Sequence, residues 1–464
     1  MADDLVHADI ATLRELFGRR AVSPVEYVTD VLDRITDRDP AIGAFVTVDR
    51  FGALRSARRA ERTLGAQGPA AFGRQPLLGM AISIKDLIPT QGIRTTRGSL
   101  LHRDWVPDFD PPLVRRLREA GAVIVGKTNT SEFGWSGASG NRVVGRTRNP
   151  WVRDRTPGGS SAGAGAATAA GFGVGSVGTD GAGSIRIPAS FCGVVGFKPS
   201  FGRIPYVPAS TELLSHAGPL ARTVADAALM YRTMAGPDPL DPWSLPVDRA
   251  ETRTAPSRIA WVPSLGAPTP DPQVESACRA AVAVLATAGH DVVEIDWPFE
   301  DPYPVLATIL AVADAAGHDE SADTLIDPGR RAVIEHGRRI SGTEHAEASR
   351  LRGDYTGRVL RWMADYDVLA TPTVPGQPFP VGLDQPTDTP VKGPASWLAW
   401  TPATYPANLT GQPAVSVPVG RTAEGCPVGL QLVGRWRADE SVLRVAGELE
   451  QLQPWHDMYD DLAD

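Results

Sequence analysis

The chain is poor in cysteine and histidine and has no long hydrophobic run. Its three cysteines, Cys192, Cys278 and Cys426, stand too far apart for a C-x-x-C pair or a metal-binding spacing. Buried free thiols in a reducing compartment fit this usage. No apolar run approaches the ~18 residues that span a membrane, and the acidic N-terminal segment lacks the apolar core of a signal peptide. We therefore expect a cytoplasmic protein that does not enter a membrane.

A concentration of positive charge is also missing. The 46 Lys and Arg residues are scattered among 54 Asp and Glu residues, which gives a net charge of −8 and no basic surface for a nucleic acid. Glycine and proline are abundant instead, with 47 and 41 residues, and no long polar run accompanies them. They predict many turns and close backbone contacts in a globular chain, because 42% of the residues are hydrophobic and can fill a large core.

Helix and strand patterns alternate along the chain. Helices are predicted at residues 10–17, 24–35, 113–120, 224–234, 274–288 and 441–452, and through most of 302–365. Strands are predicted at residues 77–88, 122–125, 291–295, 367–370, 414–419 and 428–433, the last two as a pair. This alternation indicates an α/β protein built on one large mixed sheet.

Two glycine motifs resemble nucleotide-binding loops. Residues 121–128, GAVIVGKT, satisfy the phosphate-loop pattern G-x-x-x-x-G-K-[ST], and residues 173–178, GVGSVG, satisfy the dinucleotide pattern G-x-G-x-x-G. Both patterns need a flexible turn between a strand and a helix. Here Ala-Val-Ile-Val fills the first motif with strand formers, and the GVGSVG motif reads as a strand with Lys198 near the position that needs an acidic residue. We therefore expect neither segment to bind a nucleotide.

The most unusual composition lies in residues 156–171, TPGGSSAGAGAATAAG, and 178–188, GTDGAGSIRIP. Their small residues could simply cap a helix and make a tight turn. Taken together, the two segments favour an oxyanion hole beside a serine nucleophile, because a run of small residues that ends in serine lets backbone N–H groups converge there. A serine nucleophile needs a base. No histidine stands in a familiar context, whereas Lys85, at the end of an apolar strand, can act as a base if burial keeps it neutral.

At these residues the chain resembles the amidase signature family. The matching motifs run in the family's order over nearly the whole chain: GMAISIKD at 79–86, GAVIVGKTN at 121–129, NPW at 149–151, TPGGSSAG at 156–163, GTDGAGSIRIPASFCGVVGFKPS at 178–200, YDVLATPT at 366–373, NLTGQPAVSVPVG at 408–420 and PVGLQLVG at 427–434. The resemblance implies the amidase signature fold, a large mixed sheet covered by helices on both faces. It also implies one domain over residues 5–458, with the catalytic motifs at about 77–210 and a variable helical region at about 300–365.

The resemblance implies a Ser–Ser–Lys triad without a metal or an organic cofactor. Lys85 matches the family's base, Ser160 its bridging serine after a cis Gly159–Ser160 peptide, and Ser184 its nucleophile. The backbone N–H groups expected to hold the oxyanion are those of Gly181, Ala182, Gly183 and Ser184. The residues expected to contact substrate are Gly134, Trp135, Gly159, Gly181 and Ile185.

The chain departs from the family at small positions beside the motifs. Asp180-Gly181-Ala182-Gly183-Ser184 stands where members usually read D-[TI]-G-G-S, and Gly134 stands where they often carry a larger side chain. Three activities remain open for this site. They are hydrolysis of small or aryl amides, cleavage of carbamates or urethanes by the same triad, and the glutamine-hydrolysing subunit of a tRNA-dependent amidotransferase. The last is disfavoured because residues 300–350 lack that subunit's typical stretch. We expect a small-molecule substrate and a monomer or homodimer.

Overall fold

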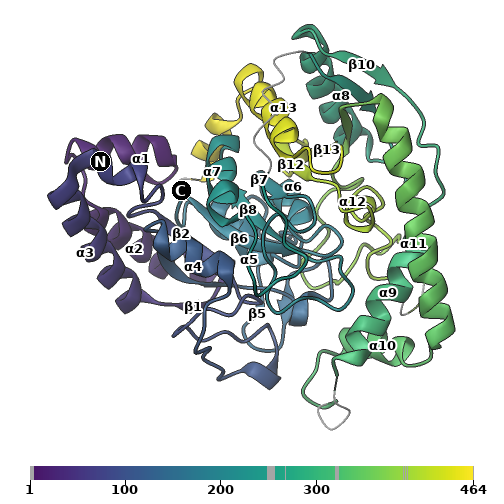
Figure 1. Ribbon diagram of the computed structural model, residues 1–464, viewed down its shortest axis with the longest axis horizontal. Coiled ribbons are helices and arrows are strands. Elements are labelled where there is room, and N and C mark those ends of the chain that lie inside the picture. Colours follow the sequence, from purple (N-terminus) through teal and green to yellow (C-terminus); the bar gives the residue numbers. More distant parts are fainter. Residues whose placement is uncertain are drawn as a thin grey trace.

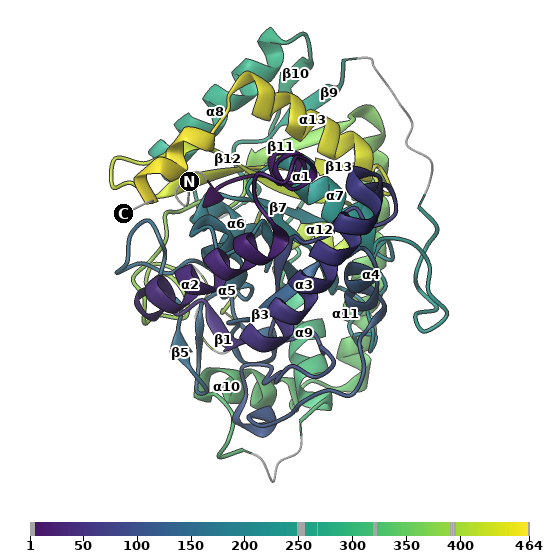
Figure 2. The same ribbon diagram turned by 90° about the vertical axis from the view of Figure 1, so that its left-hand side faces the viewer.

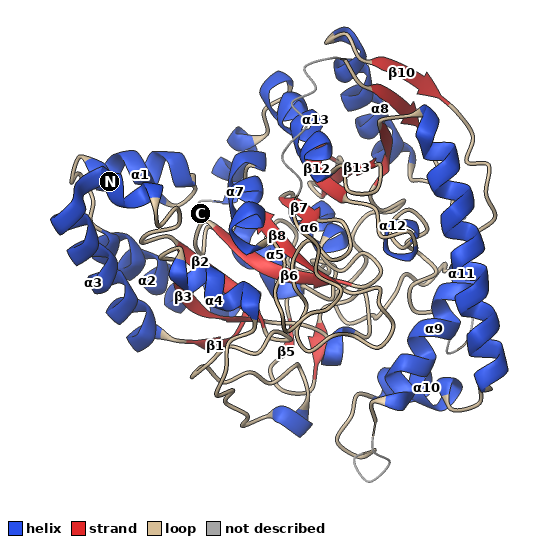
Figure 3. Cartoon of the chain, viewed as in Figure 1, coloured by secondary structure: helices blue, strands red, loops and turns tan. Residues whose placement is uncertain are grey.

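A computed structural model describes residues 5–247, 256–266, 268–318, 323–389, 391, 393 and 396–462. Its centre is an eleven-stranded mixed sheet in the order β1-β3-β2-β6-β8-β7-β12-β13-β11-β9-β10 (Figure 1, Figure 3), and β4 and β5 form a separate two-stranded sheet. The strands are β1 Phe45–Val48, β2 Ala81–Lys85, β3 Val123–Thr128, β4 Gly140–Asn141, β5 Gly145–Arg146, β6 Gly175–Asp180, β7 Val195–Lys198, β8 His216–Ala221, β9 Arg258–Trp261, β10 Asp291–Glu294, β11 Val368–Pro372, β12 Ala414–Arg421 and β13 Pro427–Gly434.

Several helices begin at caps that the sequence supplies. Ser23 and Glu26 form a capping box at the start of the second helix, and Ser341 and Glu344 form another at the start of the eleventh. The α-helices are α1 Ile10–Gly18, α2 Pro24–Ile42, α3 Arg50–Gln67, α4 Pro112–Glu119, α5 Ala162–Ala169, α6 Arg186–Cys192, α7 Val224–Met234, α8 Pro272–Thr287, α9 Tyr303–Ala316, α10 Pro328–Gly337, α11 Gly342–Trp362, α12 Pro406–Leu409 and α13 Asp439–Leu452.

Helices cover both faces of the sheet, as the family resemblance implied. Gly175 and Gly178 lie three positions apart on β6, so their side-chain positions point to opposite faces. A Cβ at Gly175 would meet Met230 of α7, whereas a Cβ at Gly178 would meet Ser161, just before α5. The view in Figure 2 shows α1, α2 and α3 together at the end of the sheet that holds β1 and β3. No described helix is long and apolar enough to cross a membrane.

The two motifs that resemble nucleotide-binding loops are strands, as the sequence predicted. β3 runs through Gly126-Lys127-Thr128, and the buried Lys127 ammonium nitrogen donates to the hydroxyl oxygens of Thr90 and Thr95 at 2.9 Å each. Burial lowers the pKa of Lys127 to about 7, against the opposing effect of Asp86. The GVGSVG motif passes into β6 at Gly175. Neither segment forms the turn between a strand and a helix that cradles a phosphate.

The predicted helical region folds as α9, α10 and α11, at the opposite side of the molecule from α1–α3 (Figure 1). The N-terminal and C-terminal segments lie together, since the rings of His7 and Tyr459 are 5.3 Å apart. One sheet also joins strands from residue 45 to residue 434. We therefore propose that residues 5–458 form a single domain.

Candidate active site

The site forms where two parallel strands end side by side. β2 pairs with β6 in parallel, with Ile84 opposite Val177, so the carboxyl ends of both strands meet at one edge of the sheet. Lys85 is the last residue of β2. Its Nζ lies 2.7 Å from Ser160 Oγ, 2.8 Å from Thr179 Oγ1 and 3.4 Å from the Thr179 carbonyl oxygen. The register of the sheet therefore places the lysine against both hydroxyls.

Lys85 is completely buried, and this burial sets its protonation. Removal from water lowers the pKa of Lys85 well below its usual value near 10.5, against the attraction of the Asp180 carboxylate. No carboxylate among the described residues forms an ion pair with its ammonium group. The amine that touches Ser160 is thus a candidate base at neutral pH.

The segment before α5 joins the two serines to the sheet. The Gly159–Ser160 peptide bond is cis, as the family resemblance implied. The next residue, Ser161, donates its backbone N–H to the carbonyl of Ser184 at 3.2 Å and its hydroxyl to the carbonyl of Thr179 at 3.1 Å. The loops of Ser160 and Ser184 are therefore held side by side, and both residues line one cavity of about 190 Å³.

The loop before Ser184 is shaped by a buried carboxylate. Asp180 accepts the backbone N–H of Gly183 at 2.7 Å and that of Ile185 at 3.1 Å. The N–H of Gly183, which was expected in the oxyanion set, therefore already donates to a side chain of the protein. The N–H groups of Gly181, Ala182 and Ser184 donate to no acceptor within the described parts of the chain. In this structure Gly183 thus differs from the other three members of the predicted oxyanion set, because its N–H donates to Asp180.

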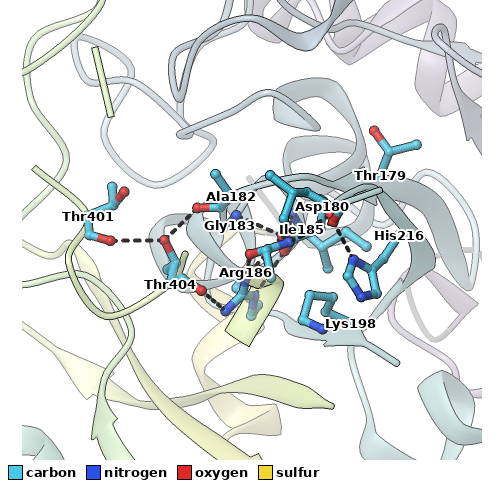
Figure 4. Close-up of polar contacts among 12 residues, drawn as sticks. Thr179, Asp180, Ala182, Gly183, Ile185, Arg186, Lys198, His216, Thr401 and Thr404 are labelled. Carbon is cyan, nitrogen blue, oxygen red and sulfur yellow. Dashed lines mark hydrogen bonds and ion pairs between the residues drawn. The ribbon is translucent and has the colours of Figure 1, made fainter. Parts of the chain in front are cut away.

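Arg186 and Asp180 form a buried ion pair behind this loop. The guanidinium Nε and Nη2 donate to the two carboxylate oxygens at 2.9 Å each. Burial alone would raise the pKa of Asp180, but Arg186 and the hydrogen bonds from its neighbours hold it well below the usual range. Arg186 also donates to the carbonyl of Thr404 at 2.6 Å, and the Thr404 hydroxyl lies 2.7 Å from the carbonyl of Ala182 (Figure 4). The loop before Ser184 is therefore held by Asp180 through backbone N–H groups and by Thr404 through the Ala182 carbonyl.

The cavity wall is partly aromatic, and it contains three of the five predicted substrate contacts. Gly134, Trp135 and Gly181 line it. Gly159 does not, because its Cα faces the Ala138 carbonyl, where a Cβ would lie at 2.0 Å. Ile185 does not either, because its fully buried side chain packs on the sheet against glycines of β6, β7 and β8. The other aromatic side chains of the wall are Phe133, Tyr206 and Trp397.

The cavity opens into an outer lobe of about 390 Å³. Leu87, Phe133 and Tyr206 belong to both lobes, together with Glu212 and Ser215. The helical region contributes Asp314 of α9, which lines both lobes, and Arg330 of α10, which lines the outer lobe. These two side chains form an ion pair at 3.2 Å.

Several residues of this cavity were not anticipated from the sequence. Thr179 had a usable signal, because it is a hydroxyl-bearing residue directly before Asp180 in the motif that leads to Ser184. Tyr206, Glu212 and Ser215 belong to the irregular segment 201–215, and Trp397 follows residues outside the described part of the chain, so neither segment carried a periodic pattern.

Comparison with known proteins agrees with this geometry. The family profile described as amidase matches residues 26–443. An acylamidase of Rhodococcus erythropolis is 37% identical and is covered over 93% of its length by 94% of this chain. A glutamyl-tRNA(Gln) amidotransferase subunit of Desulforapulum autotrophicum is 36% identical, with 95% of this chain and 96% of that protein covered.

A solved structure gives the same result. The crystal structure of a bacterial aryl acylamidase of the amidase signature family superposes with a TM-score of 0.89 at 27% identity, and the match covers 99% of both chains. Profile, sequence relatives and structure thus agree over nearly the full length. The chain belongs to the amidase signature family and is an enzyme that hydrolyses amides.

Proposed function

We propose that the enzyme hydrolyses small or aryl amides through an acyl-enzyme on Ser184, with Ser160 as the bridging proton relay and Lys85 as the base. The observation that carries this proposal is the 2.7 Å contact between the buried Lys85 amine and Ser160, whose loop also holds Ser184 at the same cavity. Cytoplasmic location, a small-molecule substrate and a monomeric or homodimeric state remain predictions from the sequence.

Burial favours the neutral form of the Lys85 amine, and its hydrogen bonds are assigned here for that form. A neutral amine has two N–H donors and one lone pair, whereas an ammonium group has three donors and no acceptor. Thr179 supplies two acceptors, its hydroxyl oxygen at 2.8 Å and its carbonyl oxygen at 3.4 Å. The lone pair is then left for the hydroxyl hydrogen of Ser160. Lys85 can accept that proton while Ser160 accepts the proton of Ser184.

The remaining steps follow from the loop geometry. Ser184 Oγ attacks the substrate carbonyl carbon, and the N–H groups of Gly181, Ala182 and Ser184 stabilise the negative oxygen. Ser160 then returns a proton to the leaving nitrogen, so the C–N bond breaks and an ester with Ser184 remains. A water molecule then attacks the ester carbonyl while the same relay of Ser160 and Lys85 accepts its proton. The acid is released, and Ser184 is regenerated.

The aromatic wall supports an aryl substrate. Phe133, Trp135, Tyr206 and Trp397 surround the space beside the two serines, and such rings pack well against a planar ring. The similarity to an acylamidase and to an aryl acylamidase points the same way. An aryl carbamate presents a comparable carbonyl and ring, so carbamate cleavage is the alternative activity of this site.

A glutamine-hydrolysing subunit is the second candidate, because curated relatives that are 34–36% identical carry the name of an amidotransferase subunit. Such a subunit would release glutamate from glutamine as part of a complex. The aromatic cavity wall favours the stand-alone amidase, and direct assay of glutamine separates the two.

The test combines covalent labelling with a substrate panel. Wild type and Ser184→Ala are treated with phenylmethanesulfonyl fluoride, and the adduct is located by peptide mass spectrometry; Ser349→Ala, an exposed serine on α11, is the matched control. We expect labelling and turnover in wild type and in the control only. Primary amides, anilides, aryl carbamates and glutamine are then assayed, with products identified by mass. Labelling of Ser184→Ala at the same loop, or turnover confined to glutamine, would overturn the proposal.

A further inference from the structure

The outer lobe of the cavity contains an arginine whose side chain has no hydrogen-bond acceptor. Arg97 lines this lobe, and its buried Nε donates to no acceptor among the described residues. Its guanidinium also forms no ion pair within the described parts of the chain, and lies over the ring of Trp105 with Cζ 4.8 Å from the ring centroid. A guanidinium has five N–H donors in one plane. A cation that leaves these donors unused at the wall of a cavity needs an explanation.

The backbone of Arg97 adopts a conformation that favours glycine. Arg97 has φ +55°, in the left-handed region that residues with a side chain rarely adopt. Its N–H donates to the carbonyl of Asp86 at 3.1 Å, which helps to hold the segment in this conformation. Glycine would occupy this position without strain. An arginine at such a position indicates a role for its side chain.

A second guanidinium of the outer lobe is only partly satisfied. Arg330 of α10 donates through Nε and Nη2 to Asp314 Oδ1 at 3.2 Å each, whereas its buried Nη1 has no acceptor among the described residues. Arg330 is 4% exposed and lines the lobe. Removal of such a donor from water without an acceptor costs free energy. An acceptor that a ligand brings into the lobe would recover this cost.

Phe133 contacts both arginines and also borders the space beside the serines. Its backbone N–H donates to the carbonyl of Arg97 at 2.8 Å, and the Arg330 guanidinium lies over its ring with Cζ 4.2 Å from the centroid. Phe133 lines both lobes, and Ser160 and Ser184 line the inner one. A substrate whose amide lies at the serines can therefore extend past Phe133 into the outer lobe.

The carboxylates of the outer lobe already accept hydrogen bonds from the protein. Asp314 accepts from Arg330, and Glu212 accepts the hydroxyl hydrogen of Ser215 at 2.5 Å. The two guanidiniums, by contrast, retain N–H groups without an acceptor among the described residues. The lobe is thus better matched to an anion than to a cation.

We propose that the outer lobe binds a carboxylate of the substrate, held by Arg97 with Nη1 of Arg330 as a further donor, so that the enzyme prefers amides that carry an acidic group. This inference rests on the proposed amide hydrolysis at Ser184. The planar fork of a guanidinium matches the two oxygens of a carboxylate. Glu212 lines the same lobe and would instead attract a cationic group, so the test includes amides of both charges.

The test compares anilides of similar size that differ in charge. N-phenylsuccinamic acid carries a carboxylate on its acyl arm, isocaproanilide carries a neutral branched group there, and β-alanine anilide carries an ammonium group. Acetanilides with a para carboxylate, methyl or aminomethyl group place the same three charges on the amine arm. The ratio of kcat/KM for the acid to kcat/KM for the neutral amide is measured in wild type, Arg97→Met and Arg97→Lys.

We expect wild type to prefer the acid in the series whose charged arm reaches the outer lobe. Arg97→Met should lower the acid-to-neutral ratio at least about tenfold, because hydrogen bonds to a charged group are lost. The loss should appear in KM, since the contact is present in the bound substrate and in the transition state alike. Arg97→Lys keeps the charge without the fork and should give an intermediate ratio. Arg55→Met, which changes an exposed arginine of α3, is the matched control and should keep the wild-type ratio.

Three results would overturn the inference. They are an unchanged ratio in both series, equal losses on acidic and neutral amides in Arg97→Met, and a preference for the ammonium-bearing amides, which would assign the lobe to Glu212. Binding is measured separately by calorimetry in Ser184→Ala, where the acid should bind more tightly than the neutral amide and Arg97→Met should remove the difference. If wild type hydrolyses no anilide while this difference in binding is present, the proposed function fails and the carboxylate site stands.

Discussion

Gly134 and Gly181 both line the cavity, yet a side chain at each should have opposite consequences. Gly181 has no left-handed backbone, and a Cβ there would lie 3.5 Å from Ser215 Oγ, an ordinary contact. Gly134 has φ +79°, and a Cβ there would lie 2.9 Å from Leu87 Cδ1 and 3.2 Å from Ser160 Oγ. The sequence showed only that both positions are smaller than is usual in the family. The structure indicates that only Gly181 leaves room that a side chain can fill.

Gly181→Thr restores the residue common in the family and should therefore change selectivity. Its side chain takes space beside Ser184 that an aryl group would occupy, and a mismatch of about one methylene costs ~1–3 kcal/mol, or at least roughly tenfold in kcat/KM. Small primary amides should lose much less. Gly134→Thr should instead lower activity on every substrate, because it displaces Ser160, and the left-handed backbone adds a cost of about 1–2 kcal/mol in stability.

The assay measures kcat/KM for one anilide and one short primary amide, together with Tm, for wild type and both variants. The expected pattern is an anilide-specific loss at nearly unchanged Tm for Gly181→Thr, and a general loss with lower Tm for Gly134→Thr. Equal losses on both substrates in Gly181→Thr would refute this account, since the glycine would then serve only the backbone. A selective effect of Gly134→Thr would refute it as well.

Two further predictions concern the lysines. Lys85→Ala should lower kcat/KM by several orders of magnitude, and Lys85→Arg should not restore it, because a guanidinium stays charged. Since burial lowers the pKa of Lys85, wild-type kcat/KM should rise with pH as the amine loses its proton, and this limb should lie well below pH 10.5; robust turnover by Lys85→Arg would identify another base. Lys127→Ala should destabilise the fold, because it leaves the hydroxyls of Thr90 and Thr95 without their donor, and ATP should shift Tm in neither protein. Micromolar ATP binding that disappears in Lys127→Ala would contradict the assignment of residues 121–128 as a strand with no ligand.

The sequence was sufficient to name the candidate residues that stand in contiguous motifs. Lys85, Ser160 and Ser184 each lie in a long motif, and the strand formers of residues 121–128 were enough to reject a phosphate loop. It was insufficient where the role of a backbone group depends on whether another residue already forms a hydrogen bond with it. Nothing in the sequence from Gly181 to Ser184 indicates that the Asp180 carboxylate accepts a hydrogen bond from the N–H of Gly183. Nor does it indicate that the N–H groups of Gly181, Ala182 and Ser184 have no acceptor among the described residues.

The sequence also could not predict the direction in which individual side chains point. Ile185 stands next to Ser184 in the chain, but the start of α6 turns its side chain into the core between three glycine-bearing strands. Conversely, Tyr206 and Glu212 lie on an irregular segment with no periodic pattern and reach the cavity only through the tertiary fold. The sequence predicted that residues 302–365 are mostly helical. It did not indicate that Asp314 and Arg330 of this region would line the outer lobe.

The anchoring of Arg186 has a consequence for the order in which the enzyme is made. Its guanidinium donates to Thr404, Asn408 and Gln431, which are translated more than 200 residues after it. Until those residues leave the ribosome, a buried cation lacks three of its acceptors and the loop of Ser184 lacks its support. The support of the Ser184 loop therefore depends on residues from both halves of the chain, and a truncation before residue 404 would leave the three catalytic candidates without it.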